Sequence, residues 1–160
     1  IGTLSKAVGA AGGFAAGSSA FIDHLWHHAR PQVFSTALPP STCAAASTGL
    51  QLITDEPDRR LHLAALADRF RGHLSQLGLP VPPGPGPIVP VLLAEASTAV
   101  EASAELSDLG FFVPAIRPPT VPLGTARLRV SLSALHSQQD IDQLADAIAA
   151  VIPMEVRTRA

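Results

Sequence analysis

Apolar residues recur three and four positions apart in several stretches of the chain, which is the spacing of one buried helix face. This pattern, with its caps and breakers, predicts five helices. The first starts at Ser18 or Ser19 and stops at Arg30-Pro31, and the second spans residues 41–54. The third starts at Asp55 and stops at Gly78, the fourth spans residues 98–109, and the fifth starts at the Ser137–Asp140 capping box. The charged residues between 58 and 71, including Arg69, are interpreted as a solvated helix face.

Other stretches have the pattern of strands. Residues 126–133 alternate strictly, with Leu128 and Val130 on one side and Arg127 and Arg129 on the other. Shorter buried strands are predicted at residues 12–17, 88–93 and 111–113, and Pro90 places the second of these at a sheet edge or bulge. The proline-rich residues 80–87 form a stiff connector.

The composition describes a globular chain and excludes some classes of function. Of the 160 residues, 47% are apolar and 15% charged, and the formal net charge of -2 offers no basic surface for nucleic acid or membrane. There is no membrane-spanning run of apolar residues. Cys43 is the only cysteine, which favours a reducing compartment. Because the chain starts at Ile1 within what looks like a motif, we expect it to be the tail of a longer one.

Lys6 is the first candidate for chemistry. It is the only lysine of the chain and lies among small residues between Gly2 and Gly13. Such surroundings would solvate its ammonium poorly, and a neutral lysine amine is the nucleophile of Schiff-base chemistry. The alternative is a surface lysine beside a glycine-rich turn.

Three further groups leave alternatives open. The hydroxyls of Ser35 and Thr36 could cap a helix or lie in an ordinary turn. The guanidinium groups of residues 127 and 129 could bind a carboxylate or form ion pairs with nearby acids. His24 and His28 are four apart, as metal ligands on a helix would be, but no glutamate or cysteine joins them and we expect no metal.

Three motifs resemble those of the α-oxoamine synthases, which use pyridoxal 5'-phosphate (PLP). The first is the Thr-Leu-Ser-Lys-Ala-Val-Gly-Ala-Ala-Gly-Gly stretch at residues 3–13, and the second is Phe-Ser-Thr-Ala-Leu-Pro-Pro at residues 34–40. The third joins Ala-Ile-Arg-Pro-Pro-Thr-Val-Pro at residues 115–122 to Gly-Thr-Ala-Arg-Leu-Arg at residues 124–129. The last two are similar to the 8-amino-7-oxononanoate synthase branch of the family.

The resemblance implies a role for six residues. Lys6 would hold PLP covalently and act as the catalytic base, and Thr3 would contact the cofactor. Ser35 and Thr36 would bind the cofactor phosphate of a neighbouring subunit, so the active site would be shared in a homodimer. Thr120 would contact the substrate, and Arg129 would bind the carboxylate of the amino acid.

The implied fold is the aspartate-aminotransferase type, fold type I of the PLP enzymes and an α/β architecture. Residues 1–50 would end the large PLP-binding domain, and residues 51–160 would form the small C-terminal α+β domain. The implied reaction condenses L-alanine with a pimeloyl thioester, with loss of CO2, in a cytoplasmic enzyme of biotin biosynthesis. The alternatives are a sister acyltransferase, such as a glycine C-acetyltransferase, or an inactive fragment. We expect this chain alone to be inactive.

Overall fold

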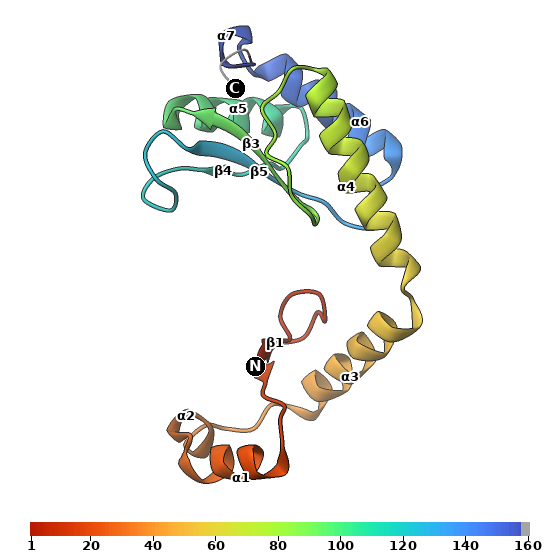
Figure 1. Ribbon diagram of the computed structural model, residues 1–160, viewed down its shortest axis with the longest axis vertical. Coiled ribbons are helices and arrows are strands. Elements are labelled where there is room, and N and C mark those ends of the chain that lie inside the picture. Colours follow the sequence, from red (N-terminus) through yellow and green to blue (C-terminus); the bar gives the residue numbers. More distant parts are fainter. Residues whose placement is uncertain (158–160) are drawn as a thin grey trace. The chain divides into compact units, whose positions relative to one another are not determined.

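The computed structural model describes residues 1–157, which form two compact units divided between Pro57 and Asp58 (Figure 1). The boundary between the units follows Pro57, whereas the sequence predicts a domain boundary after residue 50. The assignment of the first segment to a large PLP-binding domain stays a prediction. Each unit has its own hydrophobic cluster and is described by itself.

The first unit contains a two-stranded antiparallel sheet and three helices. Its elements are β1 (Gly2–Thr3), β2 (Gly13–Phe14), α1 (Ser19–His28), α2 (Arg30–Val33) and α3 (Pro40–Asp55). The predicted cap of α1 is confirmed, because the Phe21 amide donates to the Ser18 hydroxyl at 3.3 Å. The helix ends at His28, ahead of Arg30-Pro31 as predicted, but Arg30 then begins the short helix α2.

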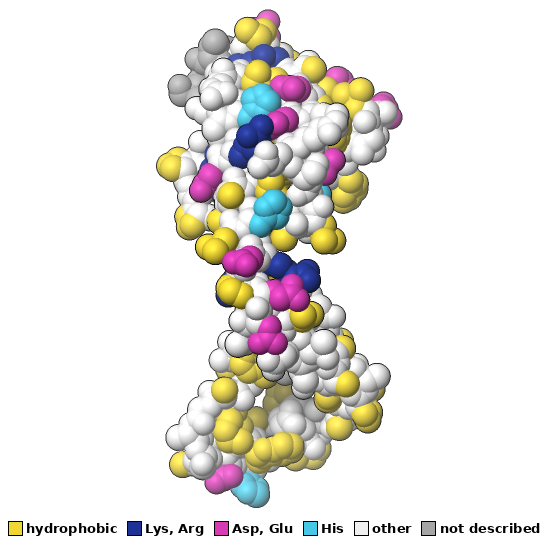
Figure 2. Space-filling model, turned by 90° about the vertical axis from the view of Figure 1, so that its right-hand side faces the viewer, with side chains coloured by type: hydrophobic (Ala, Val, Ile, Leu, Met, Phe, Trp, Pro, Cys, Tyr) yellow, Lys and Arg dark blue, Asp and Glu magenta, His cyan; other side chains and the backbone are white. Residues whose placement is uncertain are grey.

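Two expectations for this unit are wrong. The predicted buried strand at residues 12–17 is only Gly13–Phe14, both exposed, and it pairs with β1 alone. The predicted inward face of α1 has no buried residue, and its Trp26 side chain is 59% exposed. Both follow from one cause, because an apolar pattern is buried only where the fold supplies a second surface to cover it. Figure 2 shows hydrophobic side chains at the surface of the molecule.

The second unit is an antiparallel sheet packed against helices. Its elements are α4 (Asp58–Gln76), β3 (Ile88–Ala94), α5 (Ala96–Asp108), β4 (Ala115–Ile116), β5 (Ala126–Ser131), α6 (Gln138–Val151) and α7 (Met154–Arg157). The strand order is β3-β5-β4, and both pairings are antiparallel. Helix α5 contacts all three strands, and α4 and α6 lie side by side (Figure 1). This is the α+β arrangement that the sequence predicts for the C-terminal segment.

The alternating strand is confirmed and shows how the core of the second unit forms. Leu128 and Val130 of β5 are buried, Arg129 is exposed and Arg127 is half-buried. The buried side chains of β5 and β3 meet apolar residues of α4, above all Phe70, which is fully buried. β3 is an edge strand, as the sequence predicts from Pro90, and an edge is where a sheet tolerates a residue that has no N–H to donate.

The ends of the helices in this unit follow local signals. Gly78 and Gly110 have φ of +74° and +87°, the left-handed conformation that glycine adopts without strain where a helix stops. The capping box of α6 is confirmed: the Asp140 amide donates to the Ser137 hydroxyl at 3.1 Å, and the Ser137 amide donates to the Asp140 carboxylate at 2.7 Å. The latter bond lowers the pKa of Asp140 below its ordinary value.

Three details of the second unit differ from the sequence prediction. Asp55 is the last residue of α3, so it does not cap α4. Residues 111–113 are not a strand, and the Phe112 side chain is 91% exposed; the strand is Ala115–Ile116 instead. Leu109 is one of the apolar residues whose spacing predicts a buried face for the helix at residues 98–109, but it is 58% exposed. A short apolar run does not by itself supply the partner strand with which a β-strand must pair.

Among residues 1–157, none of the helices has both the length and the apolar character needed to span a membrane.

Candidate functional site

Lys6 lies at the turn of a loop that connects β1 and β2. We call residues 3–13 the lysine hairpin. Three backbone hydrogen bonds close it: from the Leu4 amide to the Gly12 carbonyl at 3.0 Å, from the Ala10 amide to the Leu4 carbonyl at 2.9 Å, and from the Gly9 amide to the Lys6 carbonyl at 3.1 Å. The backbone that carries Lys6 is therefore held by a closed set of bonds.

The lysine hairpin is anchored on helix α3. Leu4 and Ala10 of the hairpin and Ala46 of α3 are each 7% exposed and form the hydrophobic cluster of this unit, with Val8 packed against them. The alanine-rich sequence of α3 makes this contact possible, because small side chains let a helix approach other backbone closely. The anchor fixes the root of the turn and leaves Lys6 at its tip.

The Lys6 side chain is exposed, so the poor solvation predicted from the sequence is not found in the described chain. It makes no hydrogen bond or ion pair with the described residues, and its amine is free for a ligand. Close to it in the hairpin, the hydroxyl oxygens of Thr3 and Ser5 lie 2.8 Å apart, and the Ser5 amide donates to the Thr3 hydroxyl at 3.2 Å. A free amine beside two hydroxyls fits a cofactor that carries an aldehyde and a phosphate.

Ser35 and Thr36 follow α2 in the first unit, and both are exposed. The Ser35 hydroxyl donates to the Gln32 carbonyl at 3.2 Å, while Thr36 is available at the surface. The same loop touches the lysine hairpin through Leu38: a Cβ at Gly12 would lie 2.9 Å from Leu38 Cδ1. The loop and the hairpin thus belong to one unit, although within the described part of the chain no hydrogen bond joins the two hydroxyl residues to Lys6.

Thr120 and Arg129 belong to the second unit. The Thr120 amide donates to the Arg117 carbonyl at 3.1 Å, and its side chain is exposed. The Arg129 amide donates to the Pro114 carbonyl at 3.0 Å, but its guanidinium has no partner among the described residues. Arg127 differs, because its Nε donates to the Thr125 carbonyl at 2.9 Å. Of the two arginines, residue 129 is the one whose charged group is uncommitted.

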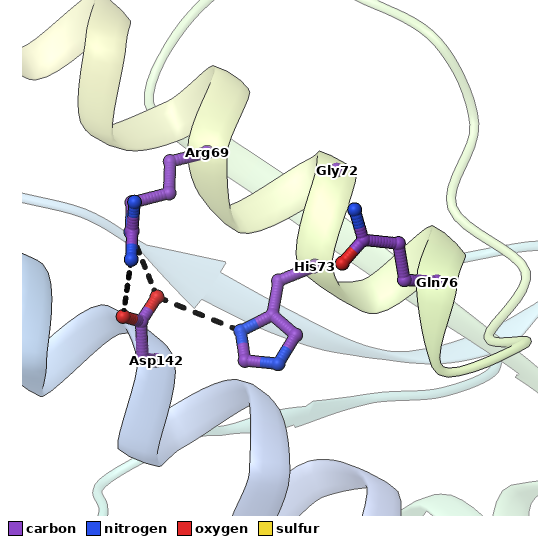
Figure 3. Close-up of a pocket in the computed structure, with 5 residues that line it drawn as sticks. All are labelled: Arg69, Gly72, His73, Gln76 and Asp142. Atoms are coloured by element: carbon purple, nitrogen blue, oxygen red, sulfur yellow. Dashed lines mark hydrogen bonds and ion pairs between the residues drawn. The ribbon is translucent and has the colours of Figure 1, made fainter.

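Sequence reasoning missed a polar cluster between α4 and α6. Arg69 binds Asp142 through two parallel hydrogen bonds, of 2.8 Å from Nε and 2.5 Å from Nη2 (Figure 3). His73 lies 3.5 Å from the same carboxylate and 3.1 Å from that of Asp146. The Arg69 bonds lower the pKa of Asp142. This side of α4 therefore binds α6 through ion pairs as well as facing solvent. The sequence signal that could have predicted the cluster is the matching four-residue spacing, Arg69 to His73 and Asp142 to Asp146.

The two histidines of α1 stack on each other. The ring centroids of His24 and His28 are 4.3 Å apart, and His28 Nδ1 lies 3.1 Å from the His24 carbonyl oxygen. Among the described residues, no group of three or more histidine, cysteine, aspartate or glutamate side chains is placed to hold a metal ion.

Comparison with known proteins assigns the chain to a family. Residues 1–148 match the family Aminotransferase class I and II. The chain is 53% identical over 153 residues to an 8-amino-7-oxononanoate synthase of Halorhodospira halophila, and 50% identical over 153 residues to one of Anaeromyxobacter dehalogenans. These alignments cover 94% and 96% of this chain but 38% of each relative, so the chain spans about two fifths of their length.

Solved structures agree with this assignment. A serine palmitoyltransferase of Sphingomonas wittichii is 32% identical with a TM-score of 0.87, over 94% of this chain and 38% of its own. Another serine palmitoyltransferase structure, solved with PLP, gives a TM-score of 0.88 at 31% identity. An 8-amino-7-oxononanoate synthase of Francisella tularensis gives 0.81 at 28% identity, over 92% of this chain and 43% of its own. The expected fold, that of the type I PLP enzymes, is confirmed, and the chain belongs to the aminotransferase class I and II family.

Proposed function

We propose that this chain is the C-terminal part of an 8-amino-7-oxononanoate synthase, a PLP-dependent acyltransferase of biotin biosynthesis. The reaction is the condensation of L-alanine with a pimeloyl thioester, in which CO2 and the carrier thiol leave. Relatives of that name at 50% and 53% identity support it. The observation that carries the proposal is the single lysine of the chain, unpaired at the tip of an anchored hairpin within the first matching motif.

Lys6 has two roles in this proposal. Its amine would hold PLP covalently, and when it is free it would take the proton from the α-carbon of alanine. PLP, when bound, supplies the electron sink that this proton removal requires. Thr3 lies three residues before the lysine on the same hairpin, and its hydroxyl is assigned to a contact with the cofactor. The anchored hairpin backbone keeps both groups in a constant relation to each other.

Arg129 and Thr120 bind the substrates. The unpaired guanidinium of Arg129 presents parallel N–H donors that match a carboxylate, so it is assigned to the carboxylate of alanine. Holding that group orients the amino acid so that its α-hydrogen faces the base. Thr120 is exposed in the loop between β4 and β5 and offers a hydroxyl to the substrate.

Ser35 and Thr36 are assigned to the cofactor phosphate of a second subunit. They are exposed, as donors to a neighbour must be, and among residues 1–157 no hydrogen bond joins them to Lys6 of their own chain. The proposal therefore includes a homodimer with shared active sites. It also places the enzyme in the cytoplasm. Thr36→Ala should weaken PLP binding, and mixing this variant with Lys6→Ala should restore one competent site for each mixed dimer.

The test of the proposed function uses the protein from the complete coding sequence. Lys6→Ala should abolish the covalent PLP linkage, seen as loss of visible absorbance and of a borohydride-reduced adduct on the peptide that contains residue 6. Lys6→Arg is the matched control, since it keeps the charge and lacks the nucleophile, and it should fail in the same way. An adduct that persists elsewhere in residues 1–160 would contradict the assignment.

The acyl donor is tested separately. Acetyl-, succinyl-, palmitoyl- and pimeloyl-CoA are assayed with glycine, serine and alanine, and the proposal expects preference for pimeloyl-CoA with alanine. Preference for acetyl-CoA with glycine would identify a glycine C-acetyltransferase instead. The 160-residue chain alone, with PLP added, should give no condensation. Measurable turnover by it would show that the remaining three fifths of the relatives' length is not needed for catalysis.

A further inference from the structure

Helix α3 meets the lysine hairpin at a glycine. A Cβ built at Gly49 would lie within 3.0 Å of the carbonyl oxygen of Val8, and 3.0 Å from its Cγ1. Side chains do not make contacts this short with backbone atoms, so only glycine allows the helix to approach as it does. Val8 is two residues after Lys6, in the turn at the tip of the hairpin (Figure 1 shows α3 beside the loop after β1).

The hairpin cannot yield locally to a larger residue at position 49. The nearest atom is a backbone oxygen, which no change of rotamer can move. Both residues that follow Val8 are hydrogen-bonded: the Gly9 amide donates to the Lys6 carbonyl, and the Ala10 amide donates to the Leu4 carbonyl, inside the buried cluster. A displacement of Val8 away from α3 therefore carries the backbone of Lys6 with it or breaks these bonds.

We propose that Gly49 is a positioning residue for Lys6, because its missing side chain sets the distance between α3 and the hairpin that presents the amine. The first part of this proposal, that Gly49 sets the distance between α3 and the hairpin, is its packing part and stands by itself. The second part, that this distance positions the Lys6 amine for PLP, rests on the proposed function. Ordinary contact begins at 3.4 Å, so an added methyl group must push the Val8 carbonyl outward by several tenths of an ångström or more. Displacements of this size at reacting groups lower rates by up to about 100-fold.

The experiment compares Gly49→Ala with Gly72→Ala in the protein from the complete coding sequence. Both glycines lie inside helices, but a Cβ at Gly72 of α4 has nothing within 4 Å. The two variants therefore gain the same helix propensity, and only one creates a contact. Amide exchange at Gly9 and Ala10, the PLP absorbance spectrum, and kcat and KM are measured for each.

Gly49→Ala should speed exchange at Gly9 and Ala10 by about tenfold or more, as overpacking does when a well-packed site must open. It should lower kcat by about 10- to 100-fold and shift the PLP absorbance, with KM for pimeloyl-CoA nearly unchanged. Gly72→Ala should match the parent protein in all of these. If Gly49→Ala does not fold, Ala46→Gly replaces it; this loss of a buried methyl should also speed exchange at Ala10.

Unchanged exchange in whichever variant folds overturns the packing part. Faster exchange with unchanged kcat and absorbance overturns the positioning role. A parent protein that binds no PLP contradicts the proposed function instead, and exchange at Gly9 and Ala10 then decides the packing part by itself.

Discussion

Replacing Arg129 by alanine should weaken the binding of alanine and leave the fold intact. The Arg129 side chain is exposed and makes no hydrogen bond or ion pair with the described residues, so its removal breaks no internal interaction. The hydrogen bond from the Arg129 amide to the Pro114 carbonyl is made by the backbone, so it survives the substitution. The free energy of unfolding should change by no more than about 0.5 kcal/mol, as at other surface positions.

The loss of binding follows from the interaction that the proposal assigns to this guanidinium. A hydrogen bond between charged groups contributes about 1.5–3 kcal/mol, which corresponds to a factor of about 10–150 in the affinity for the amino acid. The pimeloyl thioester does not use this contact, so its binding should change little. The effect should therefore appear in the KM for alanine and not in that for pimeloyl-CoA.

Arg127→Ala is the matched control on the same strand. Arg127 donates from Nε to the Thr125 carbonyl at 2.9 Å and is half-buried, so its loss should lower the free energy of unfolding by about 0.5–1.5 kcal/mol. Steady-state kinetics with both substrates and a thermal melt are recorded for each variant. If Arg127→Ala raises the KM for alanine and Arg129→Ala does not, the carboxylate has been assigned to the wrong arginine.

Three predictions concern the stability of the second unit. Phe70→Ala should lower the free energy of unfolding by about 3–5 kcal/mol, because Phe70 is fully buried, whereas Phe112→Ala, at a side chain 91% exposed, should be nearly neutral in the same denaturant titration. Ser137→Ala should cost about 0.5–2 kcal/mol through loss of the capping box of α6, and an unchanged melting temperature would contradict the role of that cap. Folding lowers the pKa of Asp142, so this carboxylate contributes stability at pH values above the ordinary pKa of an aspartate and loses that contribution as the pH falls through the lowered pKa. The melting temperature of the parent protein should therefore decrease more with acid than that of Asp142→Asn. Equal decreases in melting temperature for the two proteins would refute this.

The sequence by itself determined the features that depend on neighbouring residues. The capping box at Ser137 and Asp140 needs only residues three apart, and Gly78 and Gly110 end their helices through their own backbone freedom. The alternation around Leu128 also predicted correctly which side of β5 is buried. These elements form from local bonds and periodicity, which are readable before any long-range contact is known.

The motifs also predicted the family correctly and made Lys6 the candidate for chemistry, but they did not predict what surrounds each side chain. The sequence predicted a poorly solvated lysine among small residues, and the structure has an exposed one. Small neighbours lower solvation only if other parts of the fold cover them, and the hairpin packs Leu4, Val8 and Ala10 against α3 while the Lys6 side chain stays exposed. Which face is covered is a property of the packing and not of the local sequence.

Tertiary structure alone separated residues that look equivalent along the chain. Arg127 and Arg129 share one face of one strand, yet the first is bonded to a carbonyl of the preceding loop and the second is free. Residues 111–113 are as apolar as a strand, but the partner of β5 is Ala115–Ile116. In the sequence Gly49 is one small residue among the alanines of a helix, and nothing local distinguishes it from them. The close approach of the Val8 carbonyl shows why no side chain fits at this position. In each case the deciding atom comes from another segment, whose place is set by the cooperative packing of the unit.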